Sequence, residues 1–68
     1  MDKNDLKEGT VYLIKYSDGQ EEFGLFAYIG SLGKCVFYNS EQLSFQDSFT
    51  VDSKFVIREA TREEVENL

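Results

Sequence analysis

An Asp-Gly pair between two strongly β-prone runs is the feature that most constrains how this chain can fold. Residues 10–16 (TVYLIKY) and residues 21–29 (EEFGLFAYI) are rich in β-branched and aromatic side chains, which favour strands. The pair between them, Asp18-Gly19, is typical of a type I′ turn, because both central residues of that turn need positive φ. The sequence therefore predicts a tight β-hairpin.

A two-residue turn also predicts the register of this hairpin and its buried face. With Asp18 and Gly19 as the loop, alternate side chains of the two strands share a face. Lys15 then lies opposite Glu22 on the outer face as an ionic pair. The side chains expected on the core face are Tyr12, Ile14, Phe23 and Leu25.

The rest of the chain continues as short strands. Further β-prone runs lie at residues 34–39, 43–51 and 54–59. We interpret the GSLG segment before the first of them as a second hairpin turn. It does not fit a phosphate-binding loop, because Lys34 is followed by Cys35 instead of Ser or Thr and no helical pattern comes after it. Gly24, inside the second strand, predicts a bend or bulge there.

The C-terminal residues carry a helix-start signal. Thr61 and Glu64 have the spacing of a capping box, in which each side chain accepts a hydrogen bond from the backbone N–H of the other residue. A helix of one or two turns over residues 61–68 is too short to be stable alone. We therefore expect its Val65 and Leu68 edge to dock on the strands.

This strand pattern resembles the SH3-like small barrel. The resemblance covers residues 9–60 and implies an all-β, mostly antiparallel, five-stranded barrel, with a short C-terminal helix at 61–68 completing a single domain over 1–68. An open antiparallel sheet closed by the C-terminal helix is the alternative. The compact build and the ending at residues 58–64 (REATREE) are also similar to small phage-encoded accessory proteins.

Scarce residue types exclude most catalytic chemistry. The chain has no His and one Cys, Cys35, so one copy cannot build Ser-His-Asp or Cys-His machinery, an internal disulfide or a Cys-based zinc site. We expect Cys35 to be a buried, inert thiol. The lack of a long apolar run and of a signal-peptide pattern predicts a cytoplasmic protein without membrane contact. We expect no enzymatic activity, no metal and no cofactor.

The acidic balance bears on the class of partner. Seven basic residues against 13 acidic ones give a formal net charge of −6. Nucleic-acid binding by an SH3-like or OB-like barrel needs a basic track that neutralises phosphates, so this alternative is disfavoured. An acidic mimic of nucleic acid is a second alternative, although the charge is ordinary for a small soluble domain. We expect a non-enzymatic protein-binding module, such as a phage-encoded inhibitor or modulator of a host defence protein.

Aromatic side chains supply the expected partner surface. The chain has six Phe and four Tyr, more rings than one small core can hold. The Phe residues expected in the core are Phe23, Phe37, Phe45, Phe49 and Phe55. Half-exposed aromatic rings are typical of interfaces. The predicted partner site comprises Tyr28, Phe26, Tyr38, Tyr16 and Glu22, with Phe26 and Tyr28 on one face of their strand. The partner is another protein, and a homodimer is an open alternative.

Overall fold

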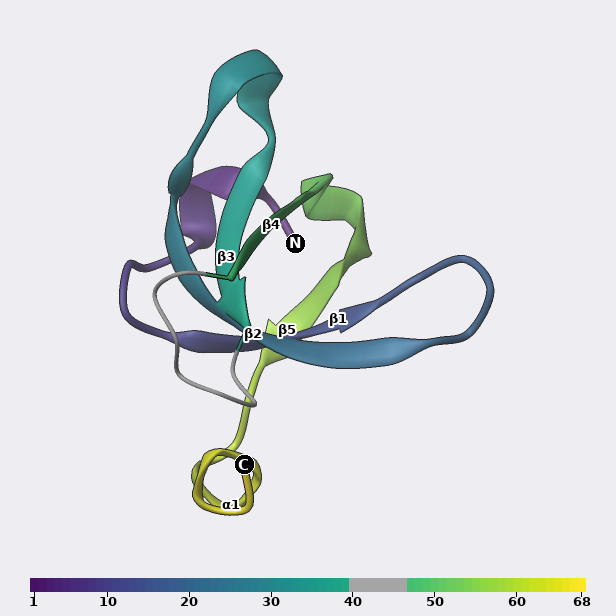
Figure 1. Cartoon of the computed structure of the whole chain (residues 1–68), viewed down its shortest axis with the longest axis vertical. Helices are drawn as coiled ribbons and strands as arrows, with labels where there is room; N and C mark the ends of the chain where they lie inside the picture. The colour runs from purple at the N-terminus through teal and green to yellow at the C-terminus, as the bar shows by residue number, and fades with distance from the viewer. Residues whose placement is uncertain (40–46) are drawn as a thin grey trace.

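A single antiparallel sheet of five strands organises the computed structural model, which describes residues 1–39 and 47–68 (Figure 1). The strand order is β4-β3-β2-β1-β5, and all neighbouring strands run antiparallel. The elements are η1 (Lys3–Asp5), β1 (Val11–Lys15), β2 (Glu21–Ile29), η2 (Ser31–Gly33), β3 (Cys35–Asn39), β4 (Ser48–Val51), η3 (Ser53–Phe55), β5 (Val56–Glu59) and α1 (Arg62–Glu66). The predicted all-β, antiparallel fold with a short C-terminal helix is confirmed.

The long strand β2 joins the two halves of the sheet. Residues 21–25 of β2 pair with β1, and residues 24–29 pair with β3. Strand β5 extends the first half through β1, and β4 extends the second half through β3. The fourth predicted strand, at 43–51, is seen as β4 at its C-terminal end, while residues 40–46 lie outside the described residues.

The loop of the β1–β2 hairpin is one residue longer than predicted. The Tyr16 N–H donates to the Gln20 carbonyl at 2.8 Å, and the Gly19 N–H donates to the Tyr16 carbonyl at 3.0 Å. The loop is therefore residues 17–19, a three-residue connection that ends in a left-handed residue, Gly19, with φ of 92°. Asp18 does not have the positive φ that a type I′ turn requires, and its carboxylate accepts the Gln20 N–H at 3.0 Å.

This one-residue slip changes every cross-strand partner. Lys15 lies opposite Glu21, with their charged atoms 3.9 Å apart, so the predicted pairing of Lys15 with Glu22 is wrong. Tyr12 lies opposite Gly24 instead of Leu25. Because side chains alternate between the faces of a strand, a slip by one residue exchanges the inner and outer sets of β2.

The core therefore differs from the prediction on β2 and agrees with it on β1. Phe23 and Leu25, expected inside, are only half-buried, and Gly24 and Phe26 take the inward positions. The core cluster comprises Tyr12, Ile14, Phe26, Cys35, Phe37, Val51 and Val56. Of the other predicted core rings, Phe49 and Phe55 are half-buried and pack against this cluster, and Phe45 lies outside the described residues.

Edge-to-face aromatic contacts fill the centre of the core. The Tyr12 ring lies 6.4 Å from Phe26 and 6.3 Å from Phe37, and these two Phe rings are 5.5 Å apart. Such geometry is favourable because the positive ring edge meets the negative ring face. The buried Tyr12 hydroxyl accepts the Lys7 N–H at 2.8 Å, which satisfies its polar end and holds the N-terminal segment against the sheet.

The predicted capping box is present at the start of α1. The Thr61 hydroxyl accepts the Glu64 N–H at 3.2 Å, and a Glu64 carboxylate oxygen accepts the Thr61 N–H at 2.8 Å. Both guanidinium nitrogens of Arg58 also donate to the Glu64 carboxylate, at 2.6 and 3.0 Å. Together these contacts attach the helix to the end of β5.

The expectation that α1 docks through its apolar edge is wrong. Val65 and Leu68 remain 42% and 45% exposed, and no residue of α1 is buried. Figure 1 shows α1 at the opposite end of the molecule from the β2–β3 hairpin tip. Two hydrogen bonds from Arg58 to the Glu64 carboxylate hold the helix near the end of β5. This five-residue helix is therefore attached without burying an apolar face.

Replacing Gly24 by Ala should destabilise the fold. A Cβ at this position would lie 3.0 Å from the Phe37 Cβ and 3.0 Å from the Phe49 Cζ, so the rings would have to move. We expect a loss of about 1–3 kcal/mol in the free energy of unfolding, measured by urea denaturation. Combining the change with Phe49→Leu should cost less than the sum of the two single changes, because the smaller side chain makes room. Strict additivity would contradict this account.

Acid should release α1 before the sheet unfolds. The Arg58 guanidinium, followed by the Thr61 N–H, lowers the pKa of Glu64 from 4.5 to about 2. A carboxyl pKa that is depressed in the attached state gives stabilisation that is complete above pH 4.5 and is lost as pH falls through about 2. Amide chemical shifts of α1 followed from neutral to acid pH measure this release. Arg58→Gln should move its midpoint to higher pH, and an unchanged midpoint would contradict the assignment.

Candidate functional site

The structure separates the five predicted partner-binding residues into three locations. Phe26 is 5% exposed and belongs to the core. Tyr28 is 57% exposed, and together with the half-buried Tyr38 it lines a surface pocket. Tyr16 and Glu22 bind each other beside the β1–β2 loop. The prediction that Phe26 and Tyr28 share an outer face is therefore wrong. Phe26, Tyr28 and Tyr38 nevertheless line one pocket, which Tyr16 and Glu22 do not line.

A bulge in β2 explains why Phe26 and Tyr28 do not share a face. Phe26 lies opposite Phe37 on β3, whereas Tyr28 lies opposite Val36, so Ala27 is an extra residue in the ladder. An extra residue breaks the alternation of side chains along a strand. Phe26 consequently points into the core while Tyr28 points outward.

Outward side chains of β2 and β3 form a strip that we call the outer strip, defined as Leu25, Tyr28, Val36 and Tyr38. Tyr38 lies opposite Leu25, and Val36 lies opposite Tyr28, so each strand contributes two members. Val36 is only 6% exposed although it faces outward. An ideal Cβ built on Gly30 would lie 3.0 Å from the Val36 Cγ2 atom and 3.9 Å from the Tyr28 ring. Val36 and the Tyr28 ring therefore both lie close to Gly30.

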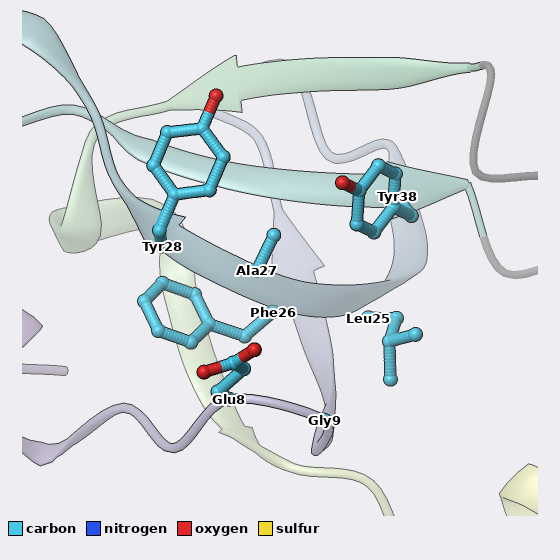
Figure 2. Close-up of a pocket in the computed structure, with 7 residues that line it drawn as sticks. All are labelled: Glu8, Gly9, Leu25, Phe26, Ala27, Tyr28 and Tyr38. Carbon is cyan, nitrogen blue, oxygen red and sulfur yellow. The ribbon is translucent and has the colours of Figure 1, made fainter.

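The pocket has a volume of about 260 Å³ and lies where the N-terminal segment crosses the bulge. Its position follows from two backbone hydrogen bonds, from the Gly9 N–H to the Phe26 carbonyl at 3.0 Å and from the Phe26 N–H to the Thr10 carbonyl at 2.9 Å. Figure 2 shows the Ala27 methyl between the Tyr28 and Tyr38 rings. The lining residues are Glu8, Gly9, Leu25, Phe26, Ala27, Tyr28 and Tyr38.

This pocket combines apolar walls with a small number of polar groups. The hydroxyls of Tyr28 and Tyr38 and the carboxylate of Glu8 are its side-chain polar groups. Such a composition suits an apolar side chain whose neighbours carry hydrogen-bond donors or positive charge. Glu8, Leu25 and Ala27 were not predicted as site residues. The bulge was expected at Gly24 but lies at Ala27, and the crossing of the N-terminal segment has no signal in the sequence.

The Tyr16–Glu22 pair is internally satisfied and separate from the pocket. The Tyr16 hydroxyl donates to the Glu22 carboxylate at 2.5 Å, and its ring packs 5.9 Å from the Phe55 ring. Burial and the Glu22 carboxylate raise the pKa of Tyr16 to about 12. The hydroxyl thus stays protonated at neutral pH and holds the carboxylate, and this arrangement stabilises the end of the β1–β2 hairpin.

Potential reactive and ligand-binding groups add little to the site. Cys35 is fully buried, as predicted, and burial followed by the nearby Asp52 carboxylate raises the pKa of its thiol. Within residues 1–39 and 47–68, no three His, Cys, Asp or Glu side chains gather as a metal site would require. In the same part of the chain, no helix has the length and apolar character needed to cross a membrane.

The Cys35 thiol should react slowly in the folded protein. Its burial and raised pKa keep it away from reagents and in the unreactive protonated form. We expect labelling by a thiol reagent to be much slower in buffer than in denaturant. Cys35→Ser should lower the free energy of unfolding by about 1–3 kcal/mol, because a hydroxyl replaces a buried apolar group. Rapid labelling of the native protein would contradict this prediction.

Comparison with known proteins identifies no relative of this chain. No protein-family model, no curated protein and no solved structure matches it.

Proposed function

We propose that this chain is a non-enzymatic protein-binding module, and that the pocket beside Tyr28 and Tyr38 holds an apolar side chain of another protein. The observation that carries the proposal is the 57% exposure of Tyr28 at the rim of an apolar pocket. The bulge at Ala27 is what turns this ring outward. Bulges are often used to re-aim a side chain at a binding site, and Tyr is among the side chains that dominate interface energetics.

We also propose that the sheet curls into an SH3-like barrel. Support comes from the order β4-β3-β2-β1-β5, in which the long β2 pairs with β1 near its start and with β3 near its end. The short turn η3 between β4 and β5 brings the chain from one edge of the sheet to the other. Such a barrel would leave the outer strip accessible on its surface.

The pairing of charges favours a protein partner over nucleic acid. Among residues 1–39 and 47–68, four basic side chains form ion pairs with carboxylates. These pairs are Lys15–Glu21, Lys34–Asp52, Arg58–Glu64 and Arg62–Glu66. A basic track for phosphates would need these side chains to be free.

Tyr28→Ala should weaken partner binding without unfolding the protein. Peptides selected from a random display library on the wild-type protein serve as the partner. We expect their binding to weaken by about 1–4 kcal/mol, since an exposed ring that anchors an interface is removed. The melting temperature should change little because Tyr28 is 57% exposed. Ile57→Ala, at a residue on β5 that is 47% exposed, is the matched control and should leave binding intact.

Two outcomes would contradict the proposal. A folded Tyr28→Ala variant that binds every selected peptide with wild-type affinity would remove the pocket as the binding site. Retention of the wild-type protein on DNA or heparin, with a steep loss as salt increases, would favour the nucleic-acid alternative, because released counterions give that binding its salt dependence.

A further inference from the structure

The tip of the β2–β3 hairpin has a leucine in a left-handed backbone conformation, which such a residue rarely adopts. Leu32 has φ of 61° and ψ of 19°, and Gly33 has φ of 72°. The Lys34 N–H donates to the Ser31 carbonyl at 3.3 Å and closes the turn around these two residues. Positive φ at both central residues is the type I′ pattern, in which Asn, Asp or Gly usually comes first. In the described residues, Leu32 is the sole non-glycine residue with positive φ.

The Leu32 side chain does not stabilise the fold of a single copy of the chain. Its side chain is 96% exposed, so it has no packing contacts that would offset the left-handed backbone. The left-handed conformation is unfavourable for a residue with a Cβ, and an apolar side chain in water adds no stability. Strained residues that persist in a structure are concentrated at functional positions. The tip therefore has the features of a projecting apolar anchor.

The two ends of the outer strip carry opposite charge. At the tip, the Lys3 ammonium lies 2.8 Å from where a Gly33 Cβ would stand. Lys34 follows the turn, but its ammonium is paired with the Asp52 carboxylate at 3.6 Å. At the other end, Glu8 lines the pocket, and the exposed Asp47 lies beside the last residue of β3, whose N–H donates to the Asp47 carbonyl at 2.9 Å. The hairpin thus presents an apolar anchor beside the Lys3 ammonium at one end and an apolar pocket beside the Glu8 carboxylate at the other.

We propose that two copies of this chain associate through their outer strips about a two-fold axis near the Tyr28–Val36 pair. Antiparallel packing of the two hairpins places Leu32 of each copy in the pocket of the other. The same operation places Lys3 of each copy near Glu8 of the other, so both ends are complementary. This inference rests on the proposed function, because it names a second copy as the protein that the pocket holds.

Size and charge are both compatible with this dimer. A pocket of about 260 Å³ is large enough for a leucine side chain. The net charge of −6 on each copy repels at long range, but physiological salt screens charges beyond about 8 Å. Contacts between oppositely charged ends are closer than this and are screened less. The exposed Tyr28 rings of the two copies would meet near the axis and be removed from water together.

Sedimentation equilibrium of the wild-type protein and of Leu32→Asn tests the dimer. We expect a monomer–dimer equilibrium for the wild type and a dissociation constant raised about 10- to 30-fold by Leu32→Asn. Asn tolerates positive φ, so the melting temperature of the dilute monomer should stay the same or rise. A purely structural role for Leu32 would predict the reverse. Leu68→Asn, the same change at a leucine that is 45% exposed, should leave the dimer intact.

A charge exchange provides the second measurement. Lys3→Glu alone and Glu8→Lys alone should each weaken the dimer, and the double variant should recover it, because the two ends again attract. A wild-type protein that is monomeric at every concentration would overturn the dimer and leave the protein-binding proposal to the peptide selection. A dimer that is unaffected by Leu32→Asn, or a double variant that fails to recover, would also overturn it.

Discussion

The close approach of two aromatic rings to the backbone of β2 at Gly24 is the contact on which the rest of this structure depends. The ideal Cβ position of Gly24 is 3.0 Å from atoms of both Phe37 and Phe49, so a larger residue here would require these rings to shift. The two rings are stacked, with centroids 5.8 Å apart, across the point where β2 passes from β1 to β3. The core cluster takes side chains from both halves of the sheet that this strand joins.

The outer strip, which we propose as the binding surface, follows from the same strand. After Gly24, β2 needs Phe26 inside to complete the ring cluster with Tyr12 and Phe37. Strict alternation would then also turn Tyr28 inward, and the bulge at Ala27 prevents this. On β2, Phe26 of the core and Tyr28 of the outer strip are thus separated by one inserted residue, Ala27. Backbone hydrogen bonds from the N-terminal segment to Phe26 place Glu8 beside the pocket.

Local chemistry made part of this structure predictable from sequence. The β-prone runs at 10–16, 21–29 and 34–39, the second hairpin turn and the capping box of Thr61 and Glu64 depend on residues close together in the chain, and each was found where expected. The run at 54–59 is a strand only over Val56–Glu59, because Ser53–Phe55 form the turn η3. The register of the first hairpin was not predictable in this way. Asp18-Gly19 suits a two-residue turn and also a three-residue loop ending in a left-handed glycine. The structure has the three-residue loop, and in that register Phe26 packs against Phe37 in the core. The bulge in β2 and the position of α1 relative to the sheet likewise depend on contacts between distant segments.

The two hairpin turns show where local preference and structure disagree, and the disagreement is informative. Asp18-Gly19 has the best type I′ sequence in the chain, yet its hairpin uses a three-residue loop. The second hairpin does have positive φ at both central residues of its turn, but Leu32 stands where Asn would be preferred. Natural sequences agree with their folds at most positions, and exceptions concentrate where function competes with stability. An exposed leucine at the tip, on the same hairpin as an open apolar pocket, is such an exception. We infer that the β2–β3 hairpin is shaped for contact with another protein surface as well as for the stability of one chain.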